Sequence, residues 1–145
     1  MNYVDQFMLA LTAWRENRGG GVPGMQSVVN CIMNRCSKDR STPYAECIKR
    51  LQFSSITAVG DPELALWPVP ADAQWLAAQA LVSQAAAGTL QDITEGATLY
   101  YAPASIKTAA VFTLPDGTAI PFPEGWNVAA VRYTATIEGQ AFFTD

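Results

Sequence analysis

The sequence contains no histidine. Hydrolases built on Ser-His-Asp or Cys-His pairs need an imidazole as a base, and histidine-rich zinc sites need it as a ligand, so these classes of site are excluded. Carboxylates remain the side chains best suited to exchange a proton at neutral pH. If the protein is an enzyme, we therefore expect an aspartate or glutamate at the centre of its reaction.

Charged residues are also scarce: they make up 15% of the chain, with a net charge of -4 and no cluster of lysine or arginine. Such a chain has little attraction for a phosphate backbone, so we expect no nucleic-acid partner. The apolar stretch at residues 7 to 14 is too short to cross a bilayer, and no basic segment precedes it. We expect no signal peptide and no stable membrane insertion.

Cysteine is limited to Cys31, Cys36 and Cys47, an odd number without a CxxC pair. This usage favours free thiols in a reducing compartment over a disulfide framework. Cys31 and Cys36 lie among helical core positions, where cysteine behaves as a small apolar residue. We predict no cofactor and no metal-ligating residues, and the sequence leaves the oligomeric state open.

Half of the 145 residues are hydrophobic, which predicts one folded domain over residues 1-145. Apolar residues at helical spacing predict a first helix over residues 3 to 16, stopped by three glycines, and a second over residues 25 to 36. Further helices are expected at residues 43 to 51 and 72 to 87, separated by a long ordered loop with one helical turn. The apolar face of the first helix is predicted to comprise Tyr3, Val4, Phe7, Met8, Leu11 and Trp14, and that of the third Tyr44, Cys47, Ile48 and Leu51.

The chain changes in character after Gly88. A short strand is expected at residues 98 to 101, and two hairpins are expected around Pro115-Asp116-Gly117 and Glu138-Gly139. Helices followed by a small antiparallel region define an α+β fold. The sequence thus predicts a mostly helical N-terminal part and a small antiparallel β region near the C-terminus.

One acid stands out in the stretch AWRENRGGG, where Glu16 lies between Arg15 and Arg18 at the end of the first helix. The unpaired carbonyls of a helix end disfavour an ionised carboxylate, and shielding by the neighbouring loop would raise the pKa of Glu16 further. The positive charges of the two nearby arginines would instead lower the pKa of Glu16. The pattern alone is compatible with a solvated surface glutamate or with a general acid.

The run LALTAWRENRGGGVPGMQSVVNCIMNR, from Leu9 to Arg35, resembles the opening of the SleB-like cell wall hydrolases, a family of spore-cortex lytic enzymes and phage lysins. In that family an apolar helix ends in W-x-E-x-R-G and a second helix closes on asparagine-arginine. Later elements match in the same order, so that the resemblance covers almost the whole chain. They are Gln52-Phe53-Ser54, a D-x-T-x-GA segment at residues 92 to 97 that leads through Thr98 into Tyr100 and Tyr101, a P-x-x-W at residues 123 to 126, and a closing hairpin at residues 137 to 142.

The sequence departs from the family pattern at several positions. Arg15 replaces a common glycine, Gly20 a frequent acid, Ser55 a usual cysteine and Gln140 a histidine, and residues 107 to 124 resemble an insertion. None of these changes removes Glu16. Substrate preference is the property that they put in doubt.

The resemblance implies a lysozyme-like fold in which Glu16 protonates a glycosidic oxygen of peptidoglycan. Family members act as lytic transglycosylases, which cut after N-acetylmuramic acid and leave an anhydro end. Ordinary glycosidases place two carboxylates about 5 to 9.5 Å apart, whereas a transglycosylase manages with one acid that later acts as a base. Asp61 and Glu63 lie in the long loop and are the acids that could approach Glu16, although Asp61-Pro62 is also typical of a turn or helix cap.

The same elements supply the other candidate site residues. Gln52, Phe53 and Ser54 are predicted to bind substrate, with capping as the alternative for the two polar residues. Tyr100 and Tyr101 point to opposite faces of a strand, so we expect one in the core and one at the cleft. Arg18, Asn34 and Thr98 are expected to support the site.

Three functions remain open from the sequence. The leading one is a peptidoglycan lytic transglycosylase whose partner is the glycan strand. A hydrolytic muramidase would use Asp61 or another acid to activate water, and a non-catalytic glycan-binding or structural virion protein would keep the fold without the reaction. The small single domain suits a phage lysin that stays in the cytoplasm until it is released to the cell wall, or a virion-associated subunit.

Overall fold

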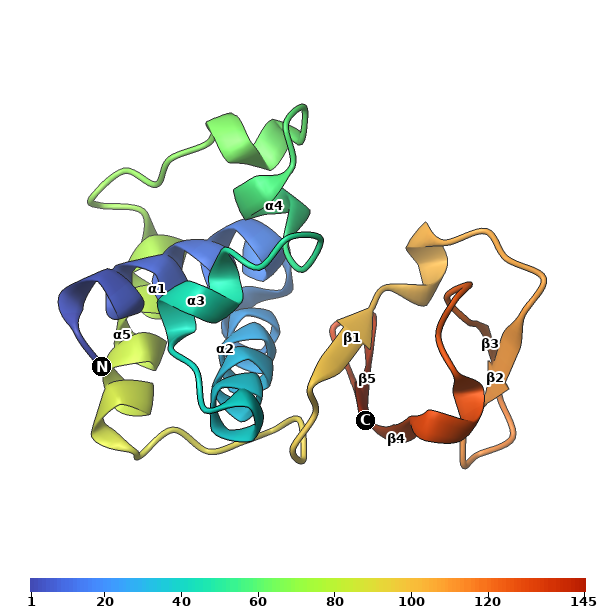
Figure 1. Ribbon diagram of the computed structural model, residues 1–145. Coiled ribbons are helices and arrows are strands. Elements are labelled where there is room, and N and C mark those ends of the chain that lie inside the picture. The colour runs from blue at the N-terminus through green and yellow to red at the C-terminus, as the bar shows by residue number, and fades with distance from the viewer.

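The computed structural model describes all residues from Met1 to Asp145. A helical part built from the first 87 residues lies beside a smaller part that carries the strands, and the two termini lie in different parts (Figure 1). The α+β prediction is confirmed, with helices first and a small antiparallel sheet near the C-terminus. The helices are α1 (Tyr3–Asn17), α2 (Gly21–Asp39), α3 (Pro43–Cys47), α4 (Ser54–Thr57) and α5 (Ala73–Ala87), and the strands are β1 (Leu99–Tyr101), β2 (Val111–Thr113), β3 (Ala119–Pro121), β4 (Arg132–Ile137) and β5 (Gln140–Thr144).

Helix α1 begins with a reciprocal cap, because the Asn2 side chain accepts from the backbone of Asp5 while the Asp5 carboxylate accepts from the backbone of Asn2. Its second half is buried on all sides. The predicted apolar face is wrong at the first turn, where Tyr3 and Val4 are 81% and 52% exposed. These two residues precede the part of the helix that the other helices cover. The buried residues of the second half are Leu9, Ala10, Leu11, Thr12, Ala13, Trp14 and Arg15.

The three glycines form a much tighter connection than predicted. Residues 18 to 20 make a single 3-10 turn, and α2 starts at Gly21 rather than at residue 25. Gly21 adopts a φ of 63°, a left-handed conformation that favours glycine, and this reverses the chain between the two helices. The end of α1 and the start of α2 are therefore held close together.

Helix α3 is shorter than predicted. Thr42 caps it and Pro43 occupies its first turn, but it ends at Cys47, and Leu51 has a φ of 66° that no helix accommodates. The predicted inward face is wrong for Tyr44, Ile48 and Leu51, which are exposed, whereas Cys47 is fully buried. The loop that follows contains two short helical pieces, α4 and a 3-10 turn at Pro62–Ala65.

The helices enclose one hydrophobic core to which α1, α2, α3 and α5 all contribute. Helix α5 has the predicted signals, since Asp72 caps its first turn and Gly88 ends it in a left-handed conformation. The three cysteines are buried free thiols, as predicted. None of the helices has the length and apolar character that crossing a bilayer requires.

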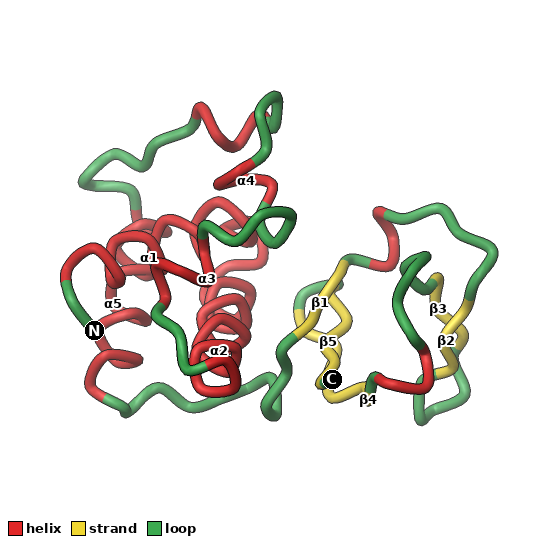
Figure 2. The backbone as a smooth tube through the Cα atoms, viewed as in Figure 1, coloured by secondary structure: helices red, strands yellow, loops and turns green.

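The strands form two antiparallel sheets, one of order β1-β5-β4 and one of β2 with β3 (Figure 2). Both predicted hairpins are present, and Glu138 and Gly139 have positive φ values of 47° and 76°, which suit a tight turn between β4 and β5. Phe143 of β5 packs among rings from the surrounding strands and loops. These rings are Tyr101, Phe112, Phe122, Trp126 and Tyr133.

The sheet is joined to the helical part by a small cluster of Cys31, Ala97 and Phe142. Asn17 also donates from its side-chain amide to Gln140 Oε1 at 3.1 Å, which links the end of α1 to the start of β5. Tyr100 stacks on Phe142 with ring centroids 5.3 Å apart. These contacts place β1 beside the end of α1.

Candidate active site

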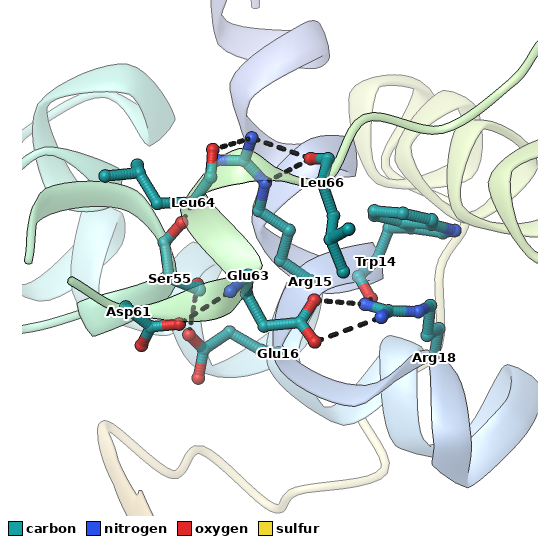
Figure 3. Close-up of polar contacts among 9 residues, drawn as sticks. All are labelled: Trp14, Arg15, Glu16, Arg18, Ser55, Asp61, Glu63, Leu64 and Leu66. Atoms are coloured by element: carbon teal, nitrogen blue, oxygen red, sulfur yellow. Dashed lines mark hydrogen bonds and ion pairs between the residues drawn. The ribbon is translucent and has the colours of Figure 1, made fainter. Parts of the chain in front are cut away.

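Three segments that are far apart in the sequence meet at the carboxyl group of Glu16. Glu16 lies in the last turn of α1 and is half-buried. The Ser55 hydroxyl of α4 donates to Glu16 Oε1, and the Tyr100 hydroxyl of β1 donates to Oε2 at 3.1 Å. Figure 3 shows the Ser55 hydroxyl directed at this carboxyl group. Glu16 is therefore held by defined partners and is not a freely solvated surface acid.

The pKa of Glu16 is raised, chiefly because burial disfavours the charged carboxylate. Hydrogen bonds from Ser55 and Tyr100 oppose this shift, the nearby carboxylate of Asp61 adds to it, and the positive charge of Arg35 opposes it. The adjacent arginines are not partners of Glu16: Arg15 bonds to backbone carbonyls and Arg18 to Glu63. Of the opposing effects expected from the sequence, burial prevails.

An open polar cleft of about 340 Å³ lies at this end of α1. Arg18 lines one side of the cleft and forms a bidentate ion pair with Glu63, in which Nη2 lies 3.0 Å from Oε1. The Arg18 guanidinium also stacks over the Trp14 ring, with Cζ 4.3 Å from the ring centroid. All of the lining residues are polar or glycine. They are Arg15, Glu16, Asn17, Arg18, Gly19 and Glu63.

A second carboxylate, Asp61, lies near Glu16 (Figure 3). It accepts from the backbone N–H of Glu63 at 2.9 Å, which is the turn role expected for Asp61-Pro62. The Ser54 hydroxyl and this N–H lower the pKa of Asp61, so Asp61 is ionised where Glu16 holds its proton. Glu63 is occupied by Arg18 and is not available for the same task.

Of the five predicted substrate-binding residues, only Tyr100 contacts Glu16. Phe53 is 1% exposed and packs in the helical core, so its ring has no free surface to offer a substrate. Tyr101 points to the opposite face of β1 and donates to the Pro121 carbonyl at 2.8 Å. Gln52 lines a separate polar pocket, and Ser54 faces Asp61. The predictions for Phe53 and Tyr101 are corrected to core roles.

The predicted supporting residues hold neighbouring segments in place. Arg18 fixes Glu63 at the cleft. Asn34 donates to Asp92, Thr94 and Ala97, and so ties the turn before β1 to α2. The Thr98 hydroxyl donates to Asp145, and its carbonyl accepts from Arg35. Asn34 and Thr98 make none of the hydrogen bonds at Glu16 and instead hold the segment that leads into β1.

Two residues at the site have roles that the sequence did not indicate. Ser55, which departs from the family pattern by replacing a cysteine, is the serine that contacts Glu16. Arg15, which replaces a common glycine of the family pattern, donates from its guanidinium to the carbonyls of Ser55, Leu64 and Leu66. No three side chains of histidine, cysteine, aspartate or glutamate come together as metal ligands.

In the comparison with known proteins, no family model, no curated protein and no solved structure matches the chain.

Proposed function

We propose that the protein is a peptidoglycan-cleaving glycosidase, a lytic transglycosylase with a lysozyme-like fold, in which Glu16 is the general acid and then the general base. The observation that carries the proposal is the half-buried Glu16 carboxyl group, which has a raised pKa and opens onto a polar cleft. A glutamate at the end of the first long helix, beside a small antiparallel sheet, is the arrangement that the resemblance to SleB-like hydrolases implies.

The reaction uses the two protonation states of one carboxyl group. Protonated Glu16 gives its proton to the glycosidic oxygen as the bond from that oxygen to the anomeric carbon breaks. The C6 hydroxyl of the N-acetylmuramic acid then forms the new bond to the anomeric carbon, and the Glu16 carboxylate takes the hydroxyl proton. No water is consumed. Ser55 and Tyr100 donate to the carboxylate, so they stabilise the form that Glu16 adopts between the two proton transfers.

The position of Asp61 favours a second candidate, a hydrolytic muramidase. Glycosidases with two carboxylates keep one protonated and the other ionised, and the pKa values of Glu16 and Asp61 are shifted in these opposite directions. In that reaction Asp61 would activate water or stabilise the positive charge at the anomeric carbon.

Digestion of purified peptidoglycan by the wild type, Glu16→Gln and Asp61→Asn tests both candidates by mass spectrometry. A transglycosylase releases anhydro-muramic products, which are lighter by one water molecule than the reducing products of hydrolysis. We expect anhydro products from the wild type and from Asp61→Asn, and none from Glu16→Gln. If the wild type instead releases products with reducing ends, and Asp61→Asn releases none, the protein is a hydrolytic muramidase.

Glu124→Gln is the matched control, because Glu124 is exposed and makes no side-chain hydrogen bond. It should release the wild-type products. A wild type that is folded, binds peptidoglycan and releases no product from several cell-wall types would refute catalysis and leave a glycan-binding protein.

A further inference from the structure

Arg15 is a buried arginine with an unusual set of partners. Its side chain is in the last turn of α1, and the residue is only 6% exposed. Nε and Nη2 donate to the Leu66 carbonyl at 3.1 and 2.9 Å, Nη2 donates to the Leu64 carbonyl at 3.1 Å, and Nη1 donates to the Ser55 carbonyl at 3.0 Å. The guanidinium also lies 4.9 Å from the centre of the Trp67 ring. All four hydrogen bonds go to one loop.

That loop has little else to hold it. The 3-10 turn at Pro62–Ala65 contains no buried residue, and Val59 and Trp67 are 99% and 63% exposed. Phe53 anchors the start of the loop in the core, and the ion pair of Arg18 with Glu63 holds its outer part at the cleft. Ile56 packs against the core, but residues 57 to 66 include no buried residue. Burial of apolar surface therefore does not fix residues 57 to 66, and the two arginines of α1 supply contacts there.

The same loop carries the groups that act on Glu16. Arg15 bonds to the carbonyl of Ser55, whose hydroxyl bonds to Glu16. Its bonds to Leu64 and Leu66 hold the end of the turn that Asp61 begins (Figure 3). We infer that Arg15 is a positioning residue for Glu16, which holds residues 55 to 66 against the end of α1 and thereby keeps Ser55 and Asp61 at the Glu16 carboxyl group.

The chemistry of arginine suits this task. A guanidinium presents five N–H donors in a fixed plane, so that one side chain can satisfy three carbonyls, whereas lysine presents a single flexible ammonium. The positive charge of Arg15 also helps to lower the pKa of Asp61. Loss of Arg15 should therefore loosen the loop and change the titration of Glu16 as well as reduce stability.

The direction of the change follows from the groups that face Glu16. Burial by the loop and the charge of Asp61 raise the pKa of Glu16, and both weaken when the loop moves away. Loss of the Ser55 hydrogen bond, the second-largest contribution, acts in the opposite direction, while Tyr100 of β1 and Arg35 of α2 stay in place. We expect the loss of burial, the largest contribution, to prevail, so that the pKa of Glu16 falls and the protonated acid is lost at lower pH.

The test compares Arg15→Met and Arg15→Lys with Arg50→Met, a control at an exposed arginine that makes no side-chain hydrogen bond or ion pair. Carbon-13 NMR of glutamate carboxyl groups, assigned with Glu16→Gln, gives the Glu16 titration. Amide hydrogen exchange measures how firmly residues 55 to 66 are held. In Arg15→Met we expect Glu16 to titrate at lower pH and the amides of residues 55 to 66 to exchange faster than in the wild type. Arg15→Lys should give intermediate values for both measurements. Arg50→Met should match the wild type in both.

Only the activity measurement rests on the proposed function. In that measurement kcat/KM of Arg15→Met should fall by about 10- to 100-fold, with the alkaline limb of its pH profile at lower pH. A folded Arg15→Met with wild-type titration and exchange would overturn the inference. If Arg15→Met does not fold, wild-type titration and exchange in Arg15→Lys would overturn it. An inactive wild type would refute the proposed function but leave the NMR and exchange results to decide the role of Arg15.

Discussion

Replacing Gly20 with alanine tests how tightly the turn after α1 packs against the β4–β5 hairpin. A Cβ atom at this position would lie 2.7 Å from Asn17 Oδ1 and 3.0 Å from Glu138 Cβ. The first distance is shorter than real Cβ contacts and the second is tighter than most of them, so both neighbours must move. The φ of Gly20 is -83°, which alanine adopts without strain, and the effect is therefore steric.

The loss of stability can be worked out from these contacts. Moving the Asn17 side chain breaks its hydrogen bond to Gln140, which is worth about 1 kcal/mol. Displacing Glu138 in the tight turn adds about 1 to 3 kcal/mol of overpacking. Alanine recovers about 0.4 to 1 kcal/mol by restricting the unfolded chain. We expect Gly20→Ala to lower the free energy of unfolding by about 1 to 3.6 kcal/mol.

Urea unfolding of Gly20→Ala beside Gly19→Ala measures this effect. A Cβ at Gly19 would meet no atom within 4 Å, so this control should stay within about 0.5 kcal/mol of the wild type or be more stable. Equal stability of the two variants would show that the turn and the hairpin are not in close contact, and the position of β5 beside α1 would need revision.

Three further predictions concern the core, a helix cap and pH. Leu9→Ala removes a fully buried side chain from the helical core and should cost about 2 to 5 kcal/mol in urea unfolding. Asp72→Ala leaves the N–H groups of Gln74 and Trp75 without their acceptor and should cost about 1 kcal/mol in the same assay. The folded chain holds the Glu16 proton more tightly than the unfolded chain does. The stability that this proton contributes is therefore fully present below the ordinary pKa of 4.5, and it is lost as pH rises through the raised pKa of the folded chain. Glu16→Gln should therefore gain stability relative to the wild type as pH rises from 4.5 towards neutral, and a stability difference that stays constant with pH would contradict the raised pKa.

The parts of the fold that were predictable from the sequence are those with local causes. Helix α5 follows from its cap at Asp72 and its stop at Gly88, and the β4–β5 hairpin follows from Glu138-Gly139. The sequence prediction is wrong where contacts between elements decide where a helix begins. The start of α2 at Gly21 depends on close packing around Asn17 that no local pattern encodes, since glycine in a helix is unfavourable by itself.

The candidate site shows the same division. Glu16 could be predicted because its position at a helix end and its match to a family pattern are both properties of the local sequence. Ser55 could not be predicted as its partner, because it is 39 residues away, and Tyr100, 84 residues away, was expected at the site only through the resemblance. Nothing in the string Ser54-Ser55 says which hydroxyl faces α1. Arg15 is the hardest case, because arginine is rarely buried and its partners are backbone carbonyls, which every residue has.

The carboxyl group of Glu16 is held from two independent parts of the molecule. Ser55 belongs to the loop that the arginines of α1 fix, whereas Tyr100 belongs to the sheet and is held there by stacking on Phe142. Phe142 in turn packs with Cys31 of α2. A change on either side alters one of the two hydrogen bonds that oppose the effect of burial, so the protonation of Glu16 depends on the loop and the sheet together. The packing between α2 and β5 that holds Tyr100 at the end of α1 therefore contributes directly to the environment of the Glu16 carboxyl group.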